Sequence, residues 1–187
     1  MAFLKQEQLD AMGFQYLGKD VLISDKASIY NAGKICIGDH SRIDDFVILS
    51  PGSALEIGRY VHIGCYSSII GHAPVRMEDY SGVSSKVSVF SSSDDYDGEY
   101  MTNPCIPKKY TRTKHFPVYI GKHVVIGAGS IVLPGVHLEN CAVGAMSLVT
   151  KSCKDLVILA GIPAKPVKER SDMVFVLGMI LDQDLEK

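Results

Sequence analysis

The sequence predicts an all-β solenoid, a parallel β-helix in which short strands stack coil upon coil. Aliphatic residues recur every six positions in four separate stretches, and glycine directly follows several of them. A period of six fits neither an α-helix nor one long strand, but it fits short strands that turn after each hexad. Three such turns bring the chain back to its starting face, so one aliphatic residue per hexad points into a prism. The aliphatic positions are Ile37, Ile43, Leu49, Ile57, Ile63, Ile69, Met77, Val83, Val89, Ile120, Ile126, Val132 and Leu138.

The chain is expected to begin with a short helical cap within residues 1–19. Leu4, Leu9 and Met12 have near-helical spacing, and Gly13 is a stop signal. Such a helix would cover the first coil. The β-helix domain is then expected to span residues 20–166.

A long excursion loop at residues 90–117 interrupts the repeat, since no hexad survives there. Stretches of that length without a pattern are uncommon in compact folds and are usually functional. The hexads resume at Val118 and run to about Val149. One residue is missing from the repeat between Leu138 and Val143.

The C-terminal segment, residues 167–187, contains an apolar run from Met173 to Leu181. As a helix this run would be about 14 Å long, against a hydrocarbon core of about 30 Å, so it is too short to span a membrane. Because solenoid ends need caps, we expect the segment to cover the open end or to pack on a neighbouring subunit.

Composition argues against several classes of partner. The chain has 187 residues and a formal net charge of −2, with no basic stripe for nucleic acid or an anionic membrane. No signal peptide is visible at the N-terminus, so the expected location is the cytoplasm. The five cysteines are scattered and odd in number, and they predict no disulfide framework. The histidines do not align at coil spacing, so no metal is expected.

Two C-terminal segments carry a family resemblance. The hexads, the run VYIGKHVVIGAGSIVLPGV (118–136), and AVGAMSLVTK (142–151) followed by AGIPAKPVKER (160–170) resemble the left-handed β-helix acetyltransferases, of the maltose and galactoside O-acetyltransferase type. The resemblance implies left-handed coils, a homotrimer, acetyl-CoA as co-substrate, a sugar acceptor, and active sites between adjacent prisms.

The resemblance also implies a set of CoA contacts. Small residues would let the pantetheine arm lie against the edge of the coils, and lysines would pair with the phosphates. The alternative is that the small residues serve tight coil turns and that the lysine after the last hexad serves solubility. The implied contacts are Ala128, Ala145, Thr150, Lys151, Ala160, Gly161, Pro163, Ala164 and Lys165.

The chain departs from the family at the catalytic position. Where the galactoside and maltose enzymes carry a histidine base, this sequence has Asp94, followed by Asp95. A sugar hydroxyl needs a base to remove its proton, whereas an amine attacks through its own lone pair and needs mainly to be oriented. The aspartate therefore favours an amino sugar, with Asp94 holding the ammonium group. His72, the nearest preceding histidine, is the expected proton acceptor, and His115 is a further candidate.

The sequence thus also resembles enzymes that N-acetylate dTDP-4-amino-4,6-dideoxyhexoses, such as dTDP-4-amino-4,6-dideoxyglucose, for surface polysaccharides (O-antigen). Two alternatives remain open: a galactoside-type or maltose-type O-acetyltransferase, and a non-catalytic hexapeptide scaffold. The aspartates of the loop could instead solvate its tip or hold a divalent cation. Its basic residues could meet a nucleotide diphosphate or keep the loop in solution. These basic residues are Lys108, Lys109, Arg112 and Lys114.

Overall fold

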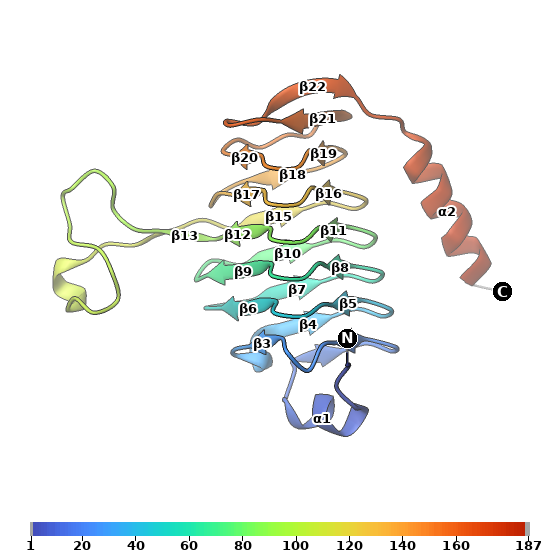
Figure 1. Cartoon of the computed structure of the whole chain (residues 1–187), viewed down its shortest axis with the longest axis horizontal. Coiled ribbons are helices and arrows are strands. Elements are labelled where there is room, and N and C mark those ends of the chain that lie inside the picture. Colours follow the sequence, from blue (N-terminus) through green and yellow to red (C-terminus); the bar gives the residue numbers. More distant parts are fainter. Residues whose placement is uncertain (1, 186–187) are drawn as a thin grey trace.

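The structure, a computed structural model that describes residues 2–185, confirms the parallel β-helix (Figure 1). Within these residues the coils build three sheets of six, eight and six strands, which form the sides of a prism. The first sheet contains β1 (Tyr16–Leu17), β4 (Ile35–Ile37), β7 (Leu55–Ile57), β10 (Val75–Met77), β15 (Val118–Ile120) and β18 (His137–Leu138). The second contains β2 (Leu22–Ile23), β5 (Arg42–Ile43), β8 (His62–Ile63), β11 (Gly82–Val83), β16 (Val125–Ile126), β19 (Ala142–Val143), β21 (Val157–Ala160) and β22 (Lys165–Glu169). The third contains β3 (Ser28–Ile29), β6 (Ile48–Pro51), β9 (Ser68–Gly71), β12 (Ser88–Phe90), β17 (Ile131–Val132) and β20 (Leu148–Val149).

The predicted aliphatic positions fill the interior of the prism. In the second sheet, Ile43, Ile63, Ile126 and their counterparts are buried and stack in register along the axis. Their immediate neighbours on the same strands face outward, as the two-residue alternation of a strand requires. The core is therefore one continuous column rather than a globular centre.

The early coils are longer than three hexads. Strand partners in the first four coils lie 20 residues apart, as Ile43 pairs with Ile63. The additional residues lie at the corner between the third and first sheets, for example between β9 and β10. The excursion loop leaves the prism at the same corner one coil later, after β12, and returns at β15. The loop is thus an enlarged version of a corner that is already extended.

Some glycines allow close packing between coils. A Cβ atom on Gly38 would come within 2.6 Å of the carbonyl carbon of Gly58 in the next coil. Left-handed turn positions are occupied both by glycines, such as Gly129, and by larger residues, among them Tyr60 and Tyr80. The corner residues form a stacked ladder of rings, His40, Tyr60, Tyr80 and His123.

Both ends of the prism are covered. Helix α1 (Gln6–Ala11) lies below the first coil and buries Leu9, as expected. The other end is covered by the antiparallel pair β21 and β22, an arrangement that the hexad pattern did not indicate. The loop carries the short pair β13 (Ser92–Ser93) and β14 (Lys114–His115), with the 3₁₀ turn η2 (Lys108–Tyr110) at its far end; a second 3₁₀ turn is η1 (Ala32–Lys34).

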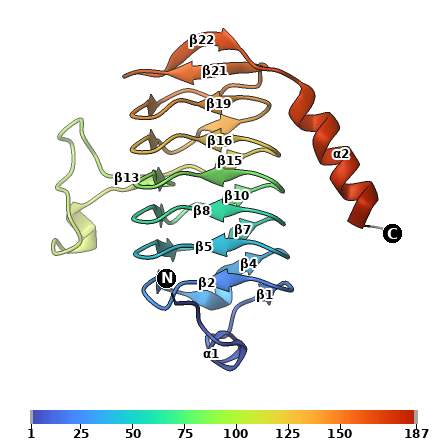
Figure 2. The ribbon, with the colours of Figure 1, turned by 45° about the vertical axis from the view of Figure 1, so that its right-hand side comes forward.

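Helix α2 (Met173–Leu185) runs back along the outside of the prism rather than over its end (Figures 1 and 2). Its Asp182 accepts a hydrogen bond of 2.5 Å from the hydroxyl of Tyr80 and lies 3.2 Å from Arg59. Gly178 sits against the ring of His123, where a Cβ would come within 2.4 Å. Most of the apolar side chains of α2 are exposed. Across residues 2–185, no helix is both long enough and apolar enough to cross a membrane.

Candidate active site

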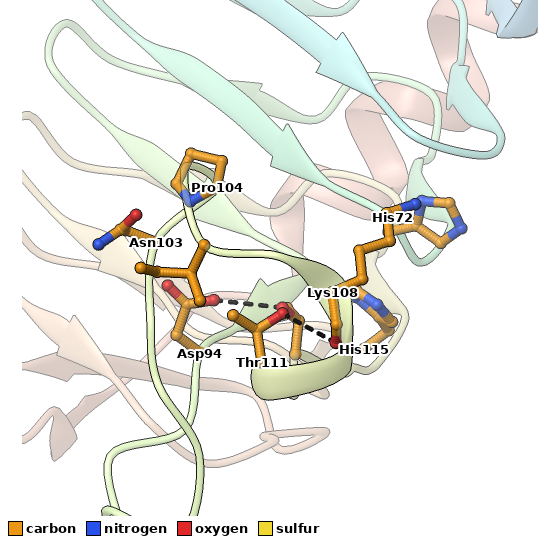
Figure 3. Close-up of a pocket in the computed structure, with 9 residues that line it drawn as sticks. His72, Asp94, Asn103, Pro104, Lys108, Thr111 and His115 are labelled. Carbon is orange, nitrogen blue, oxygen red and sulfur yellow. Dashed lines mark hydrogen bonds between the residues drawn. The ribbon is translucent and has the colours of Figure 1, made fainter.

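The excursion loop and the corner below it enclose a polar cavity of ≈ 530 Å³, here called the loop cavity. It forms because the corner after β9, which carries His72, lies directly beneath the departing loop. Its lining residues are His72, Asp94, Asn103, Pro104, Ile106, Lys108, Thr111, Thr113 and His115. In Figure 3 Asp94 lies at one end of the cavity, and His72 and His115 lie together at the other.

Asp94 also borders a second cavity of ≈ 600 Å³, here called the apolar cavity. Its walls are mainly Phe90, Tyr96, Ile131, Leu133, Pro134 and Leu148. Asp94 and Thr113 line both cavities, and the Thr113 hydroxyl donates to the Asp94 carboxylate at 3.2 Å. The exposed carboxylate thus stands on the wall between a polar space and an apolar space.

The two histidines of the loop cavity are fixed through Ser92. The Ser92 hydroxyl accepts the backbone N–H of His72 at 2.7 Å and lies 2.7 Å from Nδ1 of His115. Ser92 thus ties the backbone of His72 to the ring of His115 and holds both histidines on the same side of the cavity.

Asp95 lies apart from these cavities. It is buried, and its carboxylate accepts the backbone N–H groups of Glu99 and Tyr100 at 2.9 and 3.1 Å. These bonds organise the first turn of the loop. The assignment of Asp95 to catalysis stays a prediction.

The predicted CoA contacts form a continuous strip. Ala128, Ala145 and Gly161 lie on successive coils at the corner between the second and third sheets, as the pairing of β16, β19 and β21 dictates. Ala128 and Ala145 are exposed. Ala160 packs over Gly144, where a Cβ on the glycine would meet the Ala160 Cβ at 3.3 Å.

A cavity of ≈ 450 Å³ lies near the C-terminal end of the prism. Lys151, Ala164 and Lys165 line it together with Lys154 and Asp155, and their role in CoA binding stays a prediction. Thr150 precedes the cavity along the chain, and Pro163 lies in the turn between β21 and β22. Three lysines around one cavity suit the phosphates of CoA.

A third feature lies on the outer face of the second sheet, away from the loop. This cavity of ≈ 270 Å³, here called the glycine notch, is lined by Tyr60, His62, Tyr80, Ser81, Gly82, Val83, Ser84 and Val125. Neither Asp94 nor the other loop residues contribute to its lining. Sequence reasoning missed this notch, since a glycine at an outward strand position gives no signal until the register is known.

Sequence reasoning also missed Ser92 and Thr113, which orient His115 and Asp94. Serine and threonine are ordinary loop residues, so only their placement shows the contacts. Among residues 2–185 no group of three or more histidine, cysteine, aspartate or glutamate side chains is arranged to hold a metal ion.

No family model matches the chain. Galactoside O-acetyltransferase from Escherichia coli (strain K12) is 28% identical over 137 residues, covering 73% of this chain and 64% of the relative. The protein is a left-handed β-helix acyltransferase with acyl-CoA as co-substrate, as predicted.

A nearer relative defines the family. The dTDP-4-amino-4,6-dideoxy-D-glucose acyltransferase from Escherichia coli is 49% identical over 182 residues, which cover 96% of this chain and 95% of the relative. The chain belongs to the family of this enzyme.

Solved structures support the same family relationship. AntD, an N-acyltransferase from Bacillus cereus, in complex with dTDP and 3-hydroxybutyryl-CoA, superimposes with a TM-score of 0.95 at 41% identity, covering 99% of this chain and 98% of AntD. The solved AntD variants include D94A with dTDP and CoA, and S84A with dTDP-4-amino-4,6-dideoxyglucose and CoA.

Proposed function

We propose that this protein transfers the acetyl group of acetyl-CoA to the amino group of a dTDP-linked amino sugar, with dTDP-4-amino-4,6-dideoxyglucose as the preferred acceptor. The family relationship and the ligands named for AntD support this choice. The main structural support for this function is the position of Asp94, on the wall shared by the loop cavity and the apolar cavity.

The loop cavity suits the acceptor. Lys108 offers donors to a diphosphate, and Asn103, Thr111 and His115 offer polar groups to a sugar or a base. Asp94 can receive the ammonium group of the sugar and hold the nitrogen toward the thioester. In this scheme Asp94 positions the amine. His72, the proton acceptor predicted from the sequence, lines the same cavity.

The donor would lie along the strip defined by Ala128 and Ala145, with its phosphates at the cavity that Lys151 and Lys165 line. Strand-edge amides and small side chains at this corner allow close approach of an extended pantetheine chain. The strip and lysine cavity belong to the later coils, above the loop. An acyl group at the lower end of the strip would point toward the level at which the loop leaves the prism.

We infer a homotrimer with shared sites. This chain has an aspartate and a serine at the numbers replaced in the AntD variants. Here Asp94 lines the two cavities beside the loop, whereas Ser84 lines the glycine notch. A second copy that sets its notch against the loop of the first would bring the two residues to one site. Exposed apolar side chains on the prism faces, such as Ile131, suit such contacts.

Acyl-CoA and nucleotide sugars are metabolites of the cytoplasm, and we infer that the protein acts there. The product of the proposed reaction is an activated N-acetylated dideoxysugar. Its expected use is as a building block for a surface polysaccharide such as O-antigen, in keeping with the resemblance to enzymes of that kind.

The test is CoA release from acetyl-CoA against three acceptors: dTDP-4-amino-4,6-dideoxyglucose, dTDP-glucose and a galactoside. The proposed function predicts rapid release with the amino sugar alone and a product whose mass increases by one acetyl group at nitrogen. Release with the galactoside in preference would support an O-acetyltransferase instead. Binding of CoA without turnover of any acceptor would support a non-catalytic scaffold.

A further inference from the structure

Gly82 opens the glycine notch on one outward row of the second sheet. It pairs in register with His62 on one side and Val125 on the other, and it carries no side chain between them. Ser84 lies two residues further along the chain and also lines the notch. A ligand can therefore approach the backbone at Gly82 closely.

A histidine–carboxylate pair forms the lower edge of this notch. Nε2 of His62 lies 2.9 Å from Oδ2 of Asp44, and Oδ1 of Asp44 accepts a hydrogen bond of 2.7 Å from Nε of Arg42. The Asp44 side chain is 10% exposed, whereas that of His62 is 54% exposed. A buried carboxylate thus holds a ring that remains open to the solvent and to the notch.

This arrangement sets the tautomer of the ring. Burial raises the pKa of Asp44, but the hydrogen bonds from His62 and Arg42 outweigh it and hold the pKa below its usual range. An ionised carboxylate only accepts hydrogen bonds, so Nε2 of His62 carries the proton. In the neutral ring Nδ1 then keeps a free lone pair. The groups that face this ring are Arg42 from β5, Asp44 directly after that strand, and the corner residues Tyr60 and Tyr80.

The histidines of the loop cavity are less suited to accept a proton. Nδ1 of His115 is engaged by Ser92 at 2.7 Å. His72 lies at the far end of the loop cavity from Asp94 (Figure 3). His62 instead lines the same notch as Ser84, the serine whose number matches the AntD variants.

We propose that His62 is the proton acceptor of the acyl transfer, in place of His72, and that Asp44 and Arg42 position it. This inference rests on the proposed function, with the loop of one copy facing the notch of the next. The bound ammonium group first releases one proton to water, and the neutral amine nitrogen then forms a bond to the thioester carbonyl carbon while the carbon–sulfur bond breaks. The second proton lost by the nitrogen moves to Nδ1 of His62 and then to the departing CoA thiolate, which leaves as the free thiol.

The test is steady-state turnover of the full chain with dTDP-4-amino-4,6-dideoxyglucose and saturating acetyl-CoA. The variant His62→Ala should lose about 10²–10⁴-fold in kcat, the range for general-base catalysis. Added imidazole should restore part of that loss, because the free base can occupy the vacated space. His62→Gln, which preserves polarity and much of the volume, should lose as much. His137→Ala, on the first sheet, is the matched control and should keep normal kcat.

The positioning role of Asp44 is tested separately, by the kinetics of Asp44 variants. Asp44→Asn should lower kcat while the KM for acetyl-CoA stays unchanged, and Asp44→Glu should recover part of the loss. Normal kcat in both His62 variants would overturn the proposal, as would a loss in His72→Asn that imidazole rescues. If the unaltered protein releases no CoA with any acceptor, the proposed function itself fails.

Discussion

At the residue scale the account depends on Asp94, whose exposed carboxylate stands between a polar and an apolar cavity. An aspartate is a poor base for a sugar hydroxyl but a good partner for an ammonium group. Within residues 2–185 the side chain accepts one hydrogen bond, from Thr113, which leaves most of its acceptor capacity for a ligand.

Asp94→Asn preserves the shape of this side chain and removes its charge. We expect kcat/KM for the amino sugar to fall at least about tenfold, the lower limit for a hydrogen bond to a charged group. The KM for acetyl-CoA should not change. Asp97→Asn is the control, since Asp97 is exposed on the same loop and pairs with Lys114 at 3.1 Å. Equal losses in both variants would remove Asp94 from its assigned role.

Ala145 allows a test of the predicted acetyl-CoA site. It is exposed at the middle of the strip assigned to pantetheine, so Ala145→Trp should abolish acetyl-CoA binding measured by calorimetry. Thermal unfolding should be close to normal, because the side chain points away from the core. Ala2→Trp, at an exposed position near the opposite end, should bind normally. Normal binding by a folded Ala145→Trp would show that the donor lies elsewhere.

At the scale of the element, helix α2 is held to the prism at a few defined points. Burial, with Lys122 and Arg170 nearby, lowers the pKa of His123, which lies beneath Gly178. The hydrogen bond from Tyr80, with Lys122 and Arg59 nearby, lowers the pKa of Asp182, and burial beside Asp182 raises the pKa of Tyr80 to about 12. The anchor is thus a neutral ring and an ionised carboxylate.

This anchor predicts a dependence on pH. A histidine whose folded-state pKa is lowered favours folding fully above its unfolded pKa of about 6.5, and this contribution is lost as pH falls through the lowered value. Hydrogen-exchange protection in α2 should therefore decrease below about pH 6.5, while the prism strands keep theirs. Tyr80→Phe should reduce α2 protection at every pH, and the exposed Tyr30→Phe should not. Equal protection of α2 across this pH range would contradict the anchor.

Two neighbouring residues of β16, one buried and one exposed, allow a test of how the core stabilises the fold. Ile126 is fully buried and Val125, its neighbour on β16, is 46% exposed. Ile126→Ala should cost about 2–5 kcal/mol of unfolding free energy by leaving a cavity in the column. Val125→Ala should change it by less than about 0.5 kcal/mol, as for most surface substitutions. Denaturant unfolding measures both, and similar costs would mean that the register assigned to this strand is wrong.

At the scale of the whole molecule, the fold could be predicted because it is a repeat. Hexad positions such as Ile63 and Ile126 fall in the interior column, since a fixed period leaves little choice of register. The 20-residue coils were not expected, because the additional residues lie in a corner without an aliphatic signal. The pair β21 and β22 and the path of α2 depend on contacts such as Asp182 with Tyr80, which no local pattern encodes.

The candidate site was predicted in part. The strip from Ala128 to Lys165 could be found because its residues follow the repeat in order. Asp94 was located by counting from the last hexad. His62 and Asp44 were not recognised, because they lie diagonally across two stacked coils and only the placement of their side chains brings them together. Residues of the loop such as Thr113 gain meaning only from the cavity that they line.

The central claim is that the active site combines the loop cavity of one copy with the glycine notch of another. Two single variants test it. Asp94→Asn disables the loop, and Gly82→Leu places a side chain in the notch. Each variant alone should assemble as a trimer by sedimentation and release little CoA.

The decisive measurement is CoA release by trimers assembled from both variants together. A shared site pairs an intact loop from one chain with an intact notch from the other, so random assembly should restore about a quarter of the normal sites. A site contained within one chain would restore none. Mixed trimers without activity, or a Gly82→Leu protein with normal activity, would contradict the account.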